Sequence, residues 1–470
     1  MIDIILLYPK VNFYGPMKQK DVEKHFNEPP YNLMMLSSFL RKYGFSVKIT
    51  DSQDTDYIKS LIERHRPKFV GISCISSTLD QCVKFSRLIK ETNSDTKVIL
   101  GGMHFSTGPE SNKISKHLES GLIDIIAYGE GYITLKEILE GKDFSQIKGI
   151  IYKSLSDKLS KIITNSSQKK ITNMDTLPFP DYTQIDFRKY KSANFGEQSM
   201  SLILSKGCKY NCIFCSIGNF VDKTIMLRNP LNIVAEIEHV VKKHNAEYLS
   251  FYDQFFTVLD NRLETICDYI IKRKLKIKWE IASRVDNITE QKIKKMKEAG
   301  CKCIFYGIES GSQKILDIIK KDITLEQVKK AVLLAKKYKL YVKGSFIIGL
   351  PHETKDDIMK TINLLKKLPL NFVQISIATP IPGTEMWDLA LNKKGIELID
   401  CNNPLLTTYY SHNTQLPGIS SKELKYYQQK AYRAFYFRLG FIKDTLLSRT
   451  LKELFNDFKK GLILLKLIYS

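Results

Sequence analysis

The sequence predicts an α/β protein with two successive domains of alternating strands and helices, and three observations support this fold class. First, 470 residues are too many for one ordinary hydrophobic core, and 43% hydrophobic content can fill two or three. Second, short aliphatic runs alternate with amphipathic helical patterns over residues 1–140. Third, the same alternation restarts near Ser201 and repeats six times. We expect a doubly wound, Rossmann-like domain, a partial (βα)6 barrel and a C-terminal helical segment.

The N-terminal domain is expected to span residues 1–140. Its predicted strands are Ile2–Tyr8, Val47–Asp51, Phe69–Cys74, Val98–Gly101 and Ile123–Tyr128, with helices over Leu33–Tyr43 and Gln81–Lys90. In doubly wound sheets, ligands bind beyond the carboxyl ends of the strands. Small and polar residues gather there, at Ser73–Thr78, Gly101–Thr107 and Gly129–Gly131. These three segments outline one expected ligand crevice.

A hairpin and a linker are expected over residues 141–195. Gly149–Lys153 and Ile162–Asn165 have the pattern of two paired strands. The prolines of the following TLPFPDYTQIDF favour an extended connector. We expect little chemistry in this part of the chain.

The expected barrel covers residues 196–390. Its predicted strands are Leu202–Ser205, Tyr248–Tyr252, Lys278–Ala282, Cys303–Gly307, Val342–Ile348 and Phe372–Ala378. By analogy with closed barrels, the chemistry should gather on loops at the carboxyl ends of these strands. Residues 391–470 turn helical, aromatic and basic, which indicates a packing cap or a lid.

The net charge of +22 raises the question of nucleic-acid binding, because a basic surface attracts polyanions. However, Lys far outnumbers Arg, and the excess is spread over predicted helices such as Gln291–Glu298 and Lys329–Lys339. We interpret the charge as a compositional bias on solvated helix faces, and we do not expect a dedicated nucleic-acid surface.

Targeting signals are weak in this sequence. The N-terminal apolar run opens on an acidic residue and meets Pro9, which is typical of a first strand. No stretch reaches the roughly 20 apolar residues of a membrane span, since even GLILLKLIYS contains Lys466. Nine cysteines without a disulfide-like spacing indicate a reducing compartment, so we expect a cytoplasmic protein. The aromatic and aliphatic residues 423–470 suggest a hydrophobic substrate or a peripheral membrane contact, although an amphipathic packing helix is a simpler explanation.

The strongest chemical signal is CKYNCIFC, which places Cys208, Cys212 and Cys215 directly after the first barrel strand. Three thiolates in one loop can hold a [4Fe-4S] cluster and leave one iron open. A structural zinc site would normally add a fourth Cys or His at short spacing, and none is nearby. A zinc site completed at long range by His239, His244 or the Cys301–Cys303 pair remains an alternative.

These residues resemble a known family. The CxxxCxxC spacing is that of radical S-adenosylmethionine enzymes, in particular those with an N-terminal cobalamin-type domain. Five segments resemble successive blocks of that family in the same order: SKGCKYNCIFC, FYDQFFTVLDNR, ASRVDNITEQKIKKMKEAGCKCIFYGIESGSQKIL, GSFIIGLPHETKDDI and ATPIPGTEMW. The resemblance implies that the open iron chelates S-adenosylmethionine and that the reduced cluster cleaves it to a 5'-deoxyadenosyl radical.

The resemblance also implies roles for residues at the strand ends, where rigid elements hold side chains in position. Phe214 would pack on the adenine, and the Tyr252-Asp253 pair would receive the methionine amine. The remaining expected contacts, to ribose or carboxylate, are Ser283, Arg284, Glu309 and Ser310. For Arg284 and Glu309 a structural ion pair at the barrel rim is the alternative.

The N-terminal segments EPPYNLMMLSSFLRKYGFSVKITD, GGMHFSTGPE and DIIAYGEG resemble the cobalamin-type fold, although a fold alone does not prove a ligand. The sequence lacks the DxHxxG motif through which a histidine ligates cobalt, so cobalamin is expected to bind without that ligand. Backbone at Gly101, Gly102 and Gly129 would approach the corrin closely, unless these glycines only close tight turns. Ser73, Ser76 and Ser77 would hydrogen-bond the nucleotide tail. His104 is either a lower cobalt ligand or a helix cap.

The two domains together predict a cobalamin-dependent radical methyltransferase that methylates an unactivated carbon. Radical ring formation or rearrangement is the alternative, which the sequence does not separate. A non-catalytic iron-sulfur protein that binds nucleic acid is disfavoured by the complete blocks around Asp253, Glu309 and Gly349. Transfer-RNA methylthiolation is also disfavoured, because Cys74 and Cys82 have no third partner before Cys208. We expect a small-molecule or lipid-like substrate and a reducing partner such as flavodoxin or ferredoxin.

Overall fold

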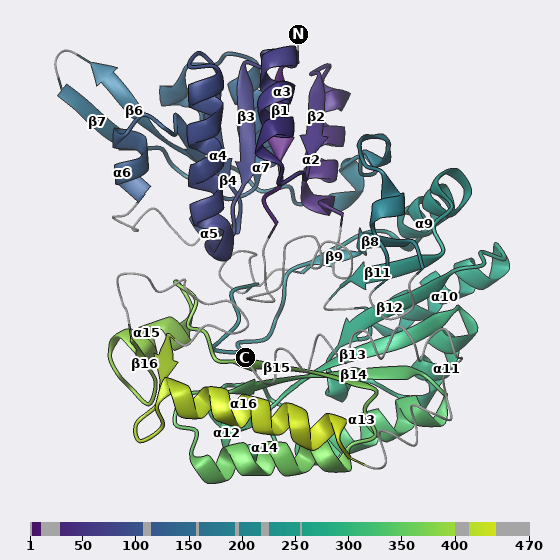
Figure 1. Ribbon diagram of the computed structural model, residues 1–470. Coiled ribbons are helices and arrows are strands. Elements are labelled where there is room, and N and C mark those ends of the chain that lie inside the picture. The colour runs from purple at the N-terminus through teal and green to yellow at the C-terminus, as the bar shows by residue number, and fades with distance from the viewer. Residues whose placement is uncertain are drawn as a thin grey trace. The chain divides into compact units, whose positions relative to one another are not determined.

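The computed structural model describes most of the chain as two compact units. The first consists of Met1–Val11 with Pro29–Phe187, and the second contains the chain from Arg188 onward (Figure 1). The described residues are 2–10, 29–106, 114–156, 159–192, 197–217, 225–253, 256–399 and 413–438. Parts of two predicted segments, Thr107 and residues 439–470, therefore lie outside the described residues.

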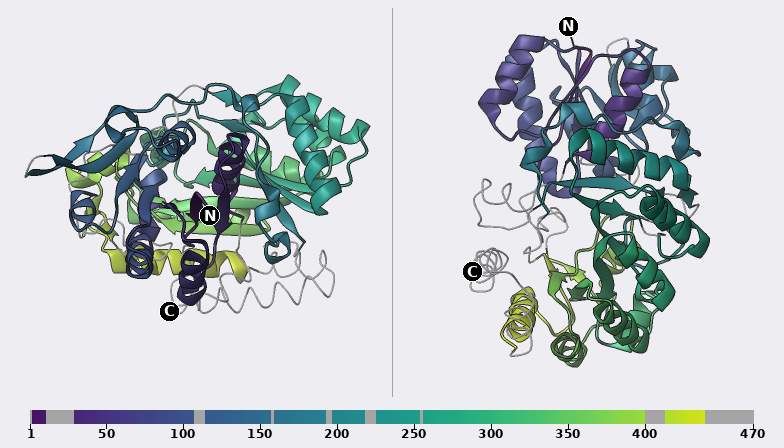
Figure 2. Two further views of the ribbon diagram at one scale, coloured as in Figure 1. Left: turned by 90° about the horizontal axis from the view of Figure 1, so that it is seen from above. Right: turned by 90° about the vertical axis from the view of Figure 1, so that its right-hand side faces the viewer.

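The first unit contains a seven-stranded sheet in the order β2-β1-β3-β4-β5-β6-β7. Five strands are parallel, as predicted: β1 (Ile4–Leu7), β2 (Val47–Thr50), β3 (Phe69–Ser73), β4 (Lys97–Gly101) and β5 (Ile125–Ala127). The connecting helices are α2 (Tyr31–Lys42), α3 (Thr55–His65), α4 (Leu79–Thr92), α5 (Met103–Ser106), α6 (Ile114–Glu119) and α7 (Gly131–Leu139). Helices lie on both faces of the sheet (Figure 2), which confirms the doubly wound class.

Strand β1 is apolar at every position because helices cover both faces of the sheet. Ile5 and Leu7 alternate with Ile4 and Leu6 along β1, so the two pairs point to opposite faces. Ile5 and Leu7 pack with Ile58 of α3 and Phe85 of α4 in one buried cluster. Both faces of the strand are covered, so all four residues are buried.

The predicted hairpin is present, and it belongs to the first sheet. β6 (Ile150–Ser156) and β7 (Leu159–Thr164) pair with each other, and β6 also pairs antiparallel with β5. The hairpin therefore extends the first sheet, and this unit runs to Phe187 instead of ending near residue 140. Without β6, the backbone N–H and C=O groups on the outer side of β5 would have no strand partner. Pairing with β6 satisfies these groups.

The second unit contains a six-stranded, all-parallel sheet in the order β15-β14-β13-β12-β11-β8. The strands are β8 (Ser199–Ile203), β11 (Tyr248–Tyr252), β12 (Lys278–Ser283), β13 (Cys301–Glu309), β14 (Tyr341–Ile348) and β15 (Phe372–Ile377). All six predicted strands are found within a few residues of their expected bounds. The two end strands β8 and β15 are not neighbours in this sheet, so the barrel is partial, as predicted.

Helices follow the strands of the second unit in the expected alternation. They are α9 (Pro230–His244), α10 (Asp260–Lys272), α11 (Glu290–Glu298), α12 (Gln313–Ile318), α13 (Leu325–Lys337), α14 (Lys355–Lys367), α15 (Glu385–Leu391) and α16 (Ser421–Tyr436). Side-chain caps begin several of them; Thr324, for example, accepts from the Gln327 N–H while the Gln327 side chain accepts from the Thr324 N–H. Figure 1 shows α11, α13 and α14 along the outer side of the curved sheet.

The inner face of the second unit's sheet, opposite the helices, is partly polar. Glu280 of β12 accepts from the Lys343 ammonium (2.7 Å), from the Ser250 hydroxyl (3.2 Å) and from the Tyr248 hydroxyl (3.2 Å). Burial raises the pKa of Glu280, but the Lys343 cation and these donors outweigh it and leave the pKa below its ordinary value. A charged and fully bonded group therefore lies inside the partial barrel.

The free edge of β15 is covered by α16. The Gln428 amide donates to the Ile375 carbonyl (2.7 Å), and the Ile375 N–H donates to the Tyr432 hydroxyl (3.0 Å). These bonds replace the strand partner that the edge lacks. The C-terminal region thus includes a packing helix, one of the two roles predicted for it. No helix within the described ranges is both long and apolar enough to cross a membrane.

We expect Tyr432→Phe to destabilise the second unit, because it leaves the Ile375 N–H without its hydroxyl partner. The expected loss is about 1–2 kcal/mol in the free energy of unfolding, the usual cost of an unsatisfied buried donor. Chemical denaturation of the full chain measures it. Tyr426→Phe is the matched control, because Tyr426 lies on the same helix and is 51% exposed. Equal stability of the two variants would contradict the role given to Tyr432.

Candidate functional site

The three cysteines of the motif lie in the loop that follows β8 and the short β9 (Ser205–Lys206). Gly207 begins this loop at φ 99°, a left-handed conformation that favours glycine. Cys208, Cys212 and Cys215 are free and partly exposed. The other five cysteines that the structure describes are free but buried: Cys74, Cys82, Cys267, Cys301 and Cys303. The motif cysteines are therefore the accessible thiols among the described residues.

The motif thiols lie close enough together to affect one another's ionisation. Burial raises the pKa of the Cys212 thiol, Lys321 and Arg284 oppose this, and the neighbouring Cys215 raises it further. Burial also raises the pKa of Cys215, and Cys208 adds to that effect. Thiols with a raised pKa keep their protons until a metal ion displaces those protons. Three convergent soft donors beside two cations suit an anionic iron-sulfur cluster.

The residues considered for a long-range zinc site lie at the other end of the sheet. His239 and His244 belong to α9, which ends just before β11 begins, and their rings are 5.4 Å apart. Cys301 and Cys303 start β13 and are fully buried. The cysteine motif follows the carboxyl end of β8. Among the described residues, no three His, Cys, Asp or Glu side chains are grouped to hold one metal ion; a [4Fe-4S] cluster takes each thiolate on a different iron.

Asp253 follows β11 and links two strand ends. Its carboxylate accepts from the Ser205 hydroxyl and from the Arg262 guanidinium (3.1 Å), and Arg262 also donates to the Leu204 carbonyl (2.6 Å). Asp253 is buried, whereas the adjoining Tyr252 is 44% exposed. The predicted contact of this pair with a methionine amine stays a prediction. The structure adds that a buried ion pair holds Asp253 in place.

Ser283 and Arg284 end β12 and begin the next loop. The Ser283 hydroxyl lies 2.8 Å from the Thr257 hydroxyl. The Arg284 guanidinium pairs with Asp286 (2.9 Å) and donates to the Lys321 carbonyl (2.6 Å). These contacts connect three loops at the carboxyl ends of the strands.

Glu309 pairs with a lysine that the sequence pattern did not single out. It forms a buried ion pair with Lys321 (2.8 Å) and accepts from the Ser345 hydroxyl (2.9 Å). Arg284 and Glu309 do not pair with each other, but each forms an ion pair with its own oppositely charged neighbour, so the structural alternative stays open for both. The charge pattern of the sequence gave no signal for Lys321, which is one of many lysines.

The backbone of Glu309 is strained. Its φ of 68° lies in the left-handed region, which a non-glycine residue adopts only when its surroundings impose it. A Cβ at Gly307 would lie 2.6 Å from the Glu309 carboxylate and 2.9 Å from the Lys321 ammonium. Glycine at position 307 thus leaves the space in which this anion and cation meet. Both charges also act on Cys215, so the pair lies beside the cysteine motif.

Ser310 and Phe214 point in different directions. The Ser310 hydroxyl is fully buried and lies 3.3 Å from the Thr361 hydroxyl of α14, behind the sheet. The Phe214 ring lies in the motif, 5.9 Å from the Lys321 ammonium. The structure thus brings Phe214, Arg284 and Glu309 together around Lys321, and it does not bring the Ser310 side chain to them.

In the first unit, the predicted residues meet at the ends of β3 and β4. Ser73 is the register partner of Gly101, and its hydroxyl accepts from the Asn32 amide (3.1 Å). Gly102 has a φ of 103°, and a Cβ there would lie 2.6 Å from the Cys74 carbonyl. Gly102 therefore closes a tight turn, which was the alternative to a role in ligand approach. The Gly129 N–H donates to Ser106 (3.2 Å).

His104 is the second residue of α5 and not a helix cap. Its Nδ1 lies 3.1 Å from the Ser76 hydroxyl. Burial lowers the pKa of His104 to about 4, and His117 contributes to the same direction. The imidazole is therefore neutral at pH 7 and holds Ser76 in position at the expected ligand crevice.

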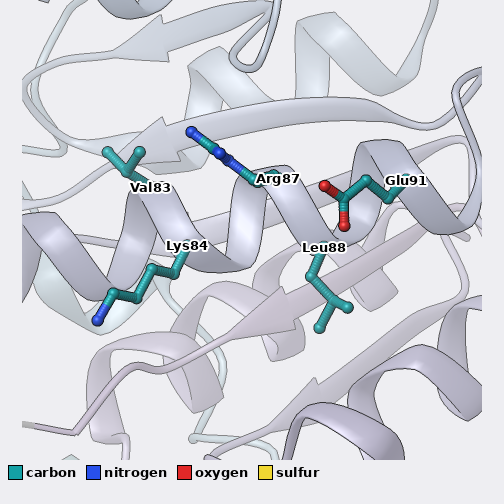
Figure 3. Close-up of a pocket in the computed structure, with 5 residues that line it drawn as sticks. All are labelled: Val83, Lys84, Arg87, Leu88 and Glu91. Atoms are coloured by element: carbon teal, nitrogen blue, oxygen red, sulfur yellow. The ribbon is translucent and has the colours of Figure 1, made fainter.

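A surface pocket of about 370 Å³ lies elsewhere in the first unit. Val83, Lys84, Arg87, Leu88 and Glu91 line it, and all five belong to α4 (Figure 3). None of them was predicted as a site residue. Because a single helix supplies the whole lining, this pocket does not enclose a ligand.

The turn after β14 contains a buried carboxylate, Glu353, to which the sequence assigned no role. It accepts from the N–H groups of Gly349 (2.6 Å) and Leu350 (3.2 Å). Its other oxygen has no hydrogen-bond partner among the described residues. Burial raises the pKa of Glu353 to about 8, although the two N–H donors act in the opposite direction.

Comparison with known proteins covers both units. A model of the radical SAM superfamily matches residues 202–365, and a model of the B12 binding domain matches residues 23–139. The chain is 32% identical over 424 residues to an uncharacterized methyltransferase of Pyrococcus horikoshii, covering 87% of this chain and 88% of that protein.

Two further proteins are similar to this chain. The anaerobic magnesium-protoporphyrin IX monomethyl ester cyclase of Rubrivivax gelatinosus is 26% identical over 376 residues, which span 77% of this chain and 66% of the cyclase. The fold resembles that of the radical S-adenosylmethionine methyltransferase TsrM of Kitasatospora setae, solved with cobalamin and a [4Fe-4S] cluster. The TM-score is 0.68 at 16% identity, over 92% of this chain and 91% of that one.

The raised pKa of Glu353 predicts a pH-dependent stability. The pKa is 4.5 in the ordinary state and about 8 in the fold, so between these values the folded chain holds the additional proton. The free energy of unfolding should therefore fall as pH rises through this window, by up to about 1.4 kcal/mol per pH unit. Glu353→Gln should remove this component, as measured by denaturation between pH 5 and 8. Glu385→Gln, at an exposed glutamate, is the control and should keep the wild-type slope; an unchanged slope in Glu353→Gln would contradict the assignment.

Proposed function

Because the chain belongs to the radical S-adenosylmethionine superfamily and carries a B12-binding domain, we propose that it is a cobalamin-dependent radical methyltransferase. The observation that carries the proposal is the combination, in one chain, of an accessible three-cysteine loop and a doubly wound domain with polar residues at its strand ends. The substrate would be a small molecule with an unactivated carbon that receives the methyl group.

Cys208, Cys212 and Cys215 would hold the [4Fe-4S] cluster. When bound, the cluster supplies the electron that cleaves S-adenosylmethionine, and the corrinoid supplies a carrier for the methyl group. The loop offers three thiols, so one iron is left for the amino and carboxylate groups of S-adenosylmethionine. The chain's own contribution is to place charged and polar groups around that ligand.

Glu309 and Lys321 suit a zwitterion. Their carboxylate and ammonium are 2.8 Å apart beside the motif, so an incoming amino group and carboxylate would each find an opposite charge. Arg284 adds a second cation, and Phe214 adds an aromatic face near Lys321. We propose that these four residues form the core of the S-adenosylmethionine site, with Tyr252, Asp253 and Ser283 on the adjoining strand ends.

The corrinoid would lie over the crevice of the first unit. Ser73 and Ser76 present hydroxyls at the end of β3, and Gly101 and Gly129 leave space at the neighbouring turns, whereas Gly102 closes the turn itself. The bond between Ser76 and His104 favours a role of His104 in orienting this hydroxyl. Binding would then proceed without the histidine of a DxHxxG motif.

A reducing partner must supply the electron. Flavodoxins and ferredoxins are the expected class, and the net charge of +22 favours association with an acidic protein of that kind. This association should weaken as ionic strength increases, because charge steers it.

The first test is anaerobic reconstitution of the full chain. We expect about four irons, a bound corrinoid, and formation of 5'-deoxyadenosine with dithionite as the reductant. Cys212→Ala should lose the cluster and the cleavage together, since it removes one of three thiolate ligands. Cys267→Ala is the matched control, because that thiol is buried and lies on α10. Cluster and cleavage without corrinoid binding would refute the cobalamin-dependent function.

The likeness to the cyclase of Rubrivivax gelatinosus favours one alternative, radical ring formation without methyl transfer. The mass of the product separates the two functions. Methyl transfer adds one carbon and two hydrogens to the substrate, whereas ring closure removes two hydrogens. A product without the added methyl group would contradict methyl transfer and support ring formation.

Gly307→Ala tests the proposed S-adenosylmethionine site. The new Cβ would displace the Glu309 carboxylate and the Lys321 ammonium, which are the mobile ends of long side chains, so the fold should remain intact. We expect weaker S-adenosylmethionine binding by roughly 10-fold, the scale of one charge-assisted hydrogen bond. Equilibrium binding to the reconstituted protein measures it, with iron content and melting temperature as checks. Unchanged affinity would contradict the site.

A further inference from the structure

The cysteine loop is held to the rest of the second unit at two points. In its second half, the Ile213 side chain is buried, its N–H donates to the Ile319 carbonyl (3.2 Å), and its carbonyl accepts from the Met386 N–H (3.0 Å). This anchor fixes the segment between Cys212 and Cys215. The segment between Cys208 and Cys212 needs an anchor of its own.

Tyr210 provides contacts for that first half. Its ring lies 3.6 Å from the Arg284 guanidinium carbon, which is the geometry of a close cation–π stack. Its hydroxyl accepts from the Asn287 amide (3.1 Å). The neighbours of Tyr210 in the loop, Lys209 and Asn211, are exposed. Tyr210 therefore joins the loop to the end of β12 by both its ring and its hydroxyl.

The guanidinium on which Tyr210 stacks is itself held in place. Arg284 forms two-pronged contacts with Asp286 and donates to the Lys321 and Asp322 carbonyls. These bonds use the edge of the guanidinium and leave its face for the ring. The cation is thus rigid, and it lies against a residue of the segment between Cys208 and Cys212.

The loop after β12 is fixed in turn by a buried lysine. The Lys292 ammonium donates to the Thr257 carbonyl (2.7 Å) and to the Asn287 carbonyl (2.9 Å). It therefore connects the loops that follow β11 and β12, and it sets the position from which Asn287 reaches Tyr210. The chain of contacts runs from the scaffold to the motif without an exposed link.

We propose that Tyr210 is a positioning residue for the cluster, which clamps the segment between Cys208 and Cys212 against Arg284 and keeps that cation beside the cluster. The inference rests on the proposed function only in that the three cysteines hold a cluster. Stacking on a cation is the essential contact, and the hydroxyl bond to Asn287 adds to it. A cation beside the cluster stabilises the reduced form, because reduction adds negative charge.

The test compares Tyr210→Leu with two aromatic variants, Tyr210→Phe and Tyr210→Trp, in the reconstituted full chain. Leucine fills much of the volume but offers no π face, whereas Phe and Trp keep the face and lose the hydroxyl. We expect Tyr210→Leu to lose iron to a chelator at least ~5-fold faster, the factor that corresponds to about 1 kcal/mol of cation–π energy. Its remaining cluster should have a more negative reduction potential than the wild type.

Phe and Trp should stay close to the wild type in both measurements. Tyr338→Leu is the matched control: Tyr338 also lies near a cation, Lys337 at 5.9 Å, and its hydroxyl donates to Glu290. It ends α13, ahead of β14, at the end of the sheet remote from the motif. This control should change neither iron loss nor potential.

Three outcomes would overturn the proposal. Tyr210→Leu could match the wild type in both iron retention and potential. Alternatively, the aromatic variants could lose iron as fast as Tyr210→Leu, which would assign the effect to the hydroxyl. If Tyr210→Leu does not fold, Tyr210→Trp decides, because a cluster lost in that variant contradicts stacking and a retained one supports it. A wild-type protein that holds four irons without transferring a methyl group would refute the proposed function and leave this clamp intact.

Discussion

Glu309 and Lys321 meet at the carboxyl ends of the strands, where a left-handed backbone, a side-chain-free Gly307 and a buried lysine all come together. A buried ion pair is stable only when its geometry is close and further hydrogen bonds support it. Ser345 bonds the carboxylate, and the loop of Lys321 is tied to Arg284 through its carbonyl. Arg284 and Phe214 both lie beside this pair, since Arg284 donates to the Lys321 carbonyl and the Phe214 ring lies 5.9 Å from the Lys321 ammonium.

Parallel strands explain why so many separate segments reach one place. In the second unit every strand delivers its following loop to the same edge of the sheet, so side chains of one loop bond the next, as Ser205 does with Asp253 and Arg284 with Lys321. Helix α16 contributes at the sheet's flank, where Gln428 and Tyr432 bond the backbone of β15. An open barrel has two edges to protect, and here one of them is closed by side chains instead of by a strand.

The sequence predicted most of the fold because its strands are short apolar runs with clear breaks, and all six barrel strands were located in this way. The place of the hairpin in the first sheet was not predicted, because pairing between β5 and β6 is a tertiary contact that leaves no local pattern. The cysteine motif was found from its spacing alone. Lys321, Tyr210 and Asn287 were missed, since a lysine in a lysine-rich chain and a tyrosine between cysteines carry no signal until their contacts are known. Ser310, in contrast, was expected in the site but does not reach it. Its neighbour Glu309 lies there, whereas the Ser310 side chain points toward Thr361 of α14.

The contrast between exposed and buried thiols also bears on how the cluster is built. Burial raises the pKa of Cys267 to about 12, and it raises the pKa of Cys301 and Cys303 further above the ordinary range. The five buried thiols are also shielded from solvent, whereas the three motif thiols are partly exposed, so a metal ion can reach the motif thiols and displace their protons. Iron delivered to the newly folded chain thus meets one competent set of ligands among the described cysteines. Selectivity of assembly is then a property of the apoprotein's fold, established before any metal arrives.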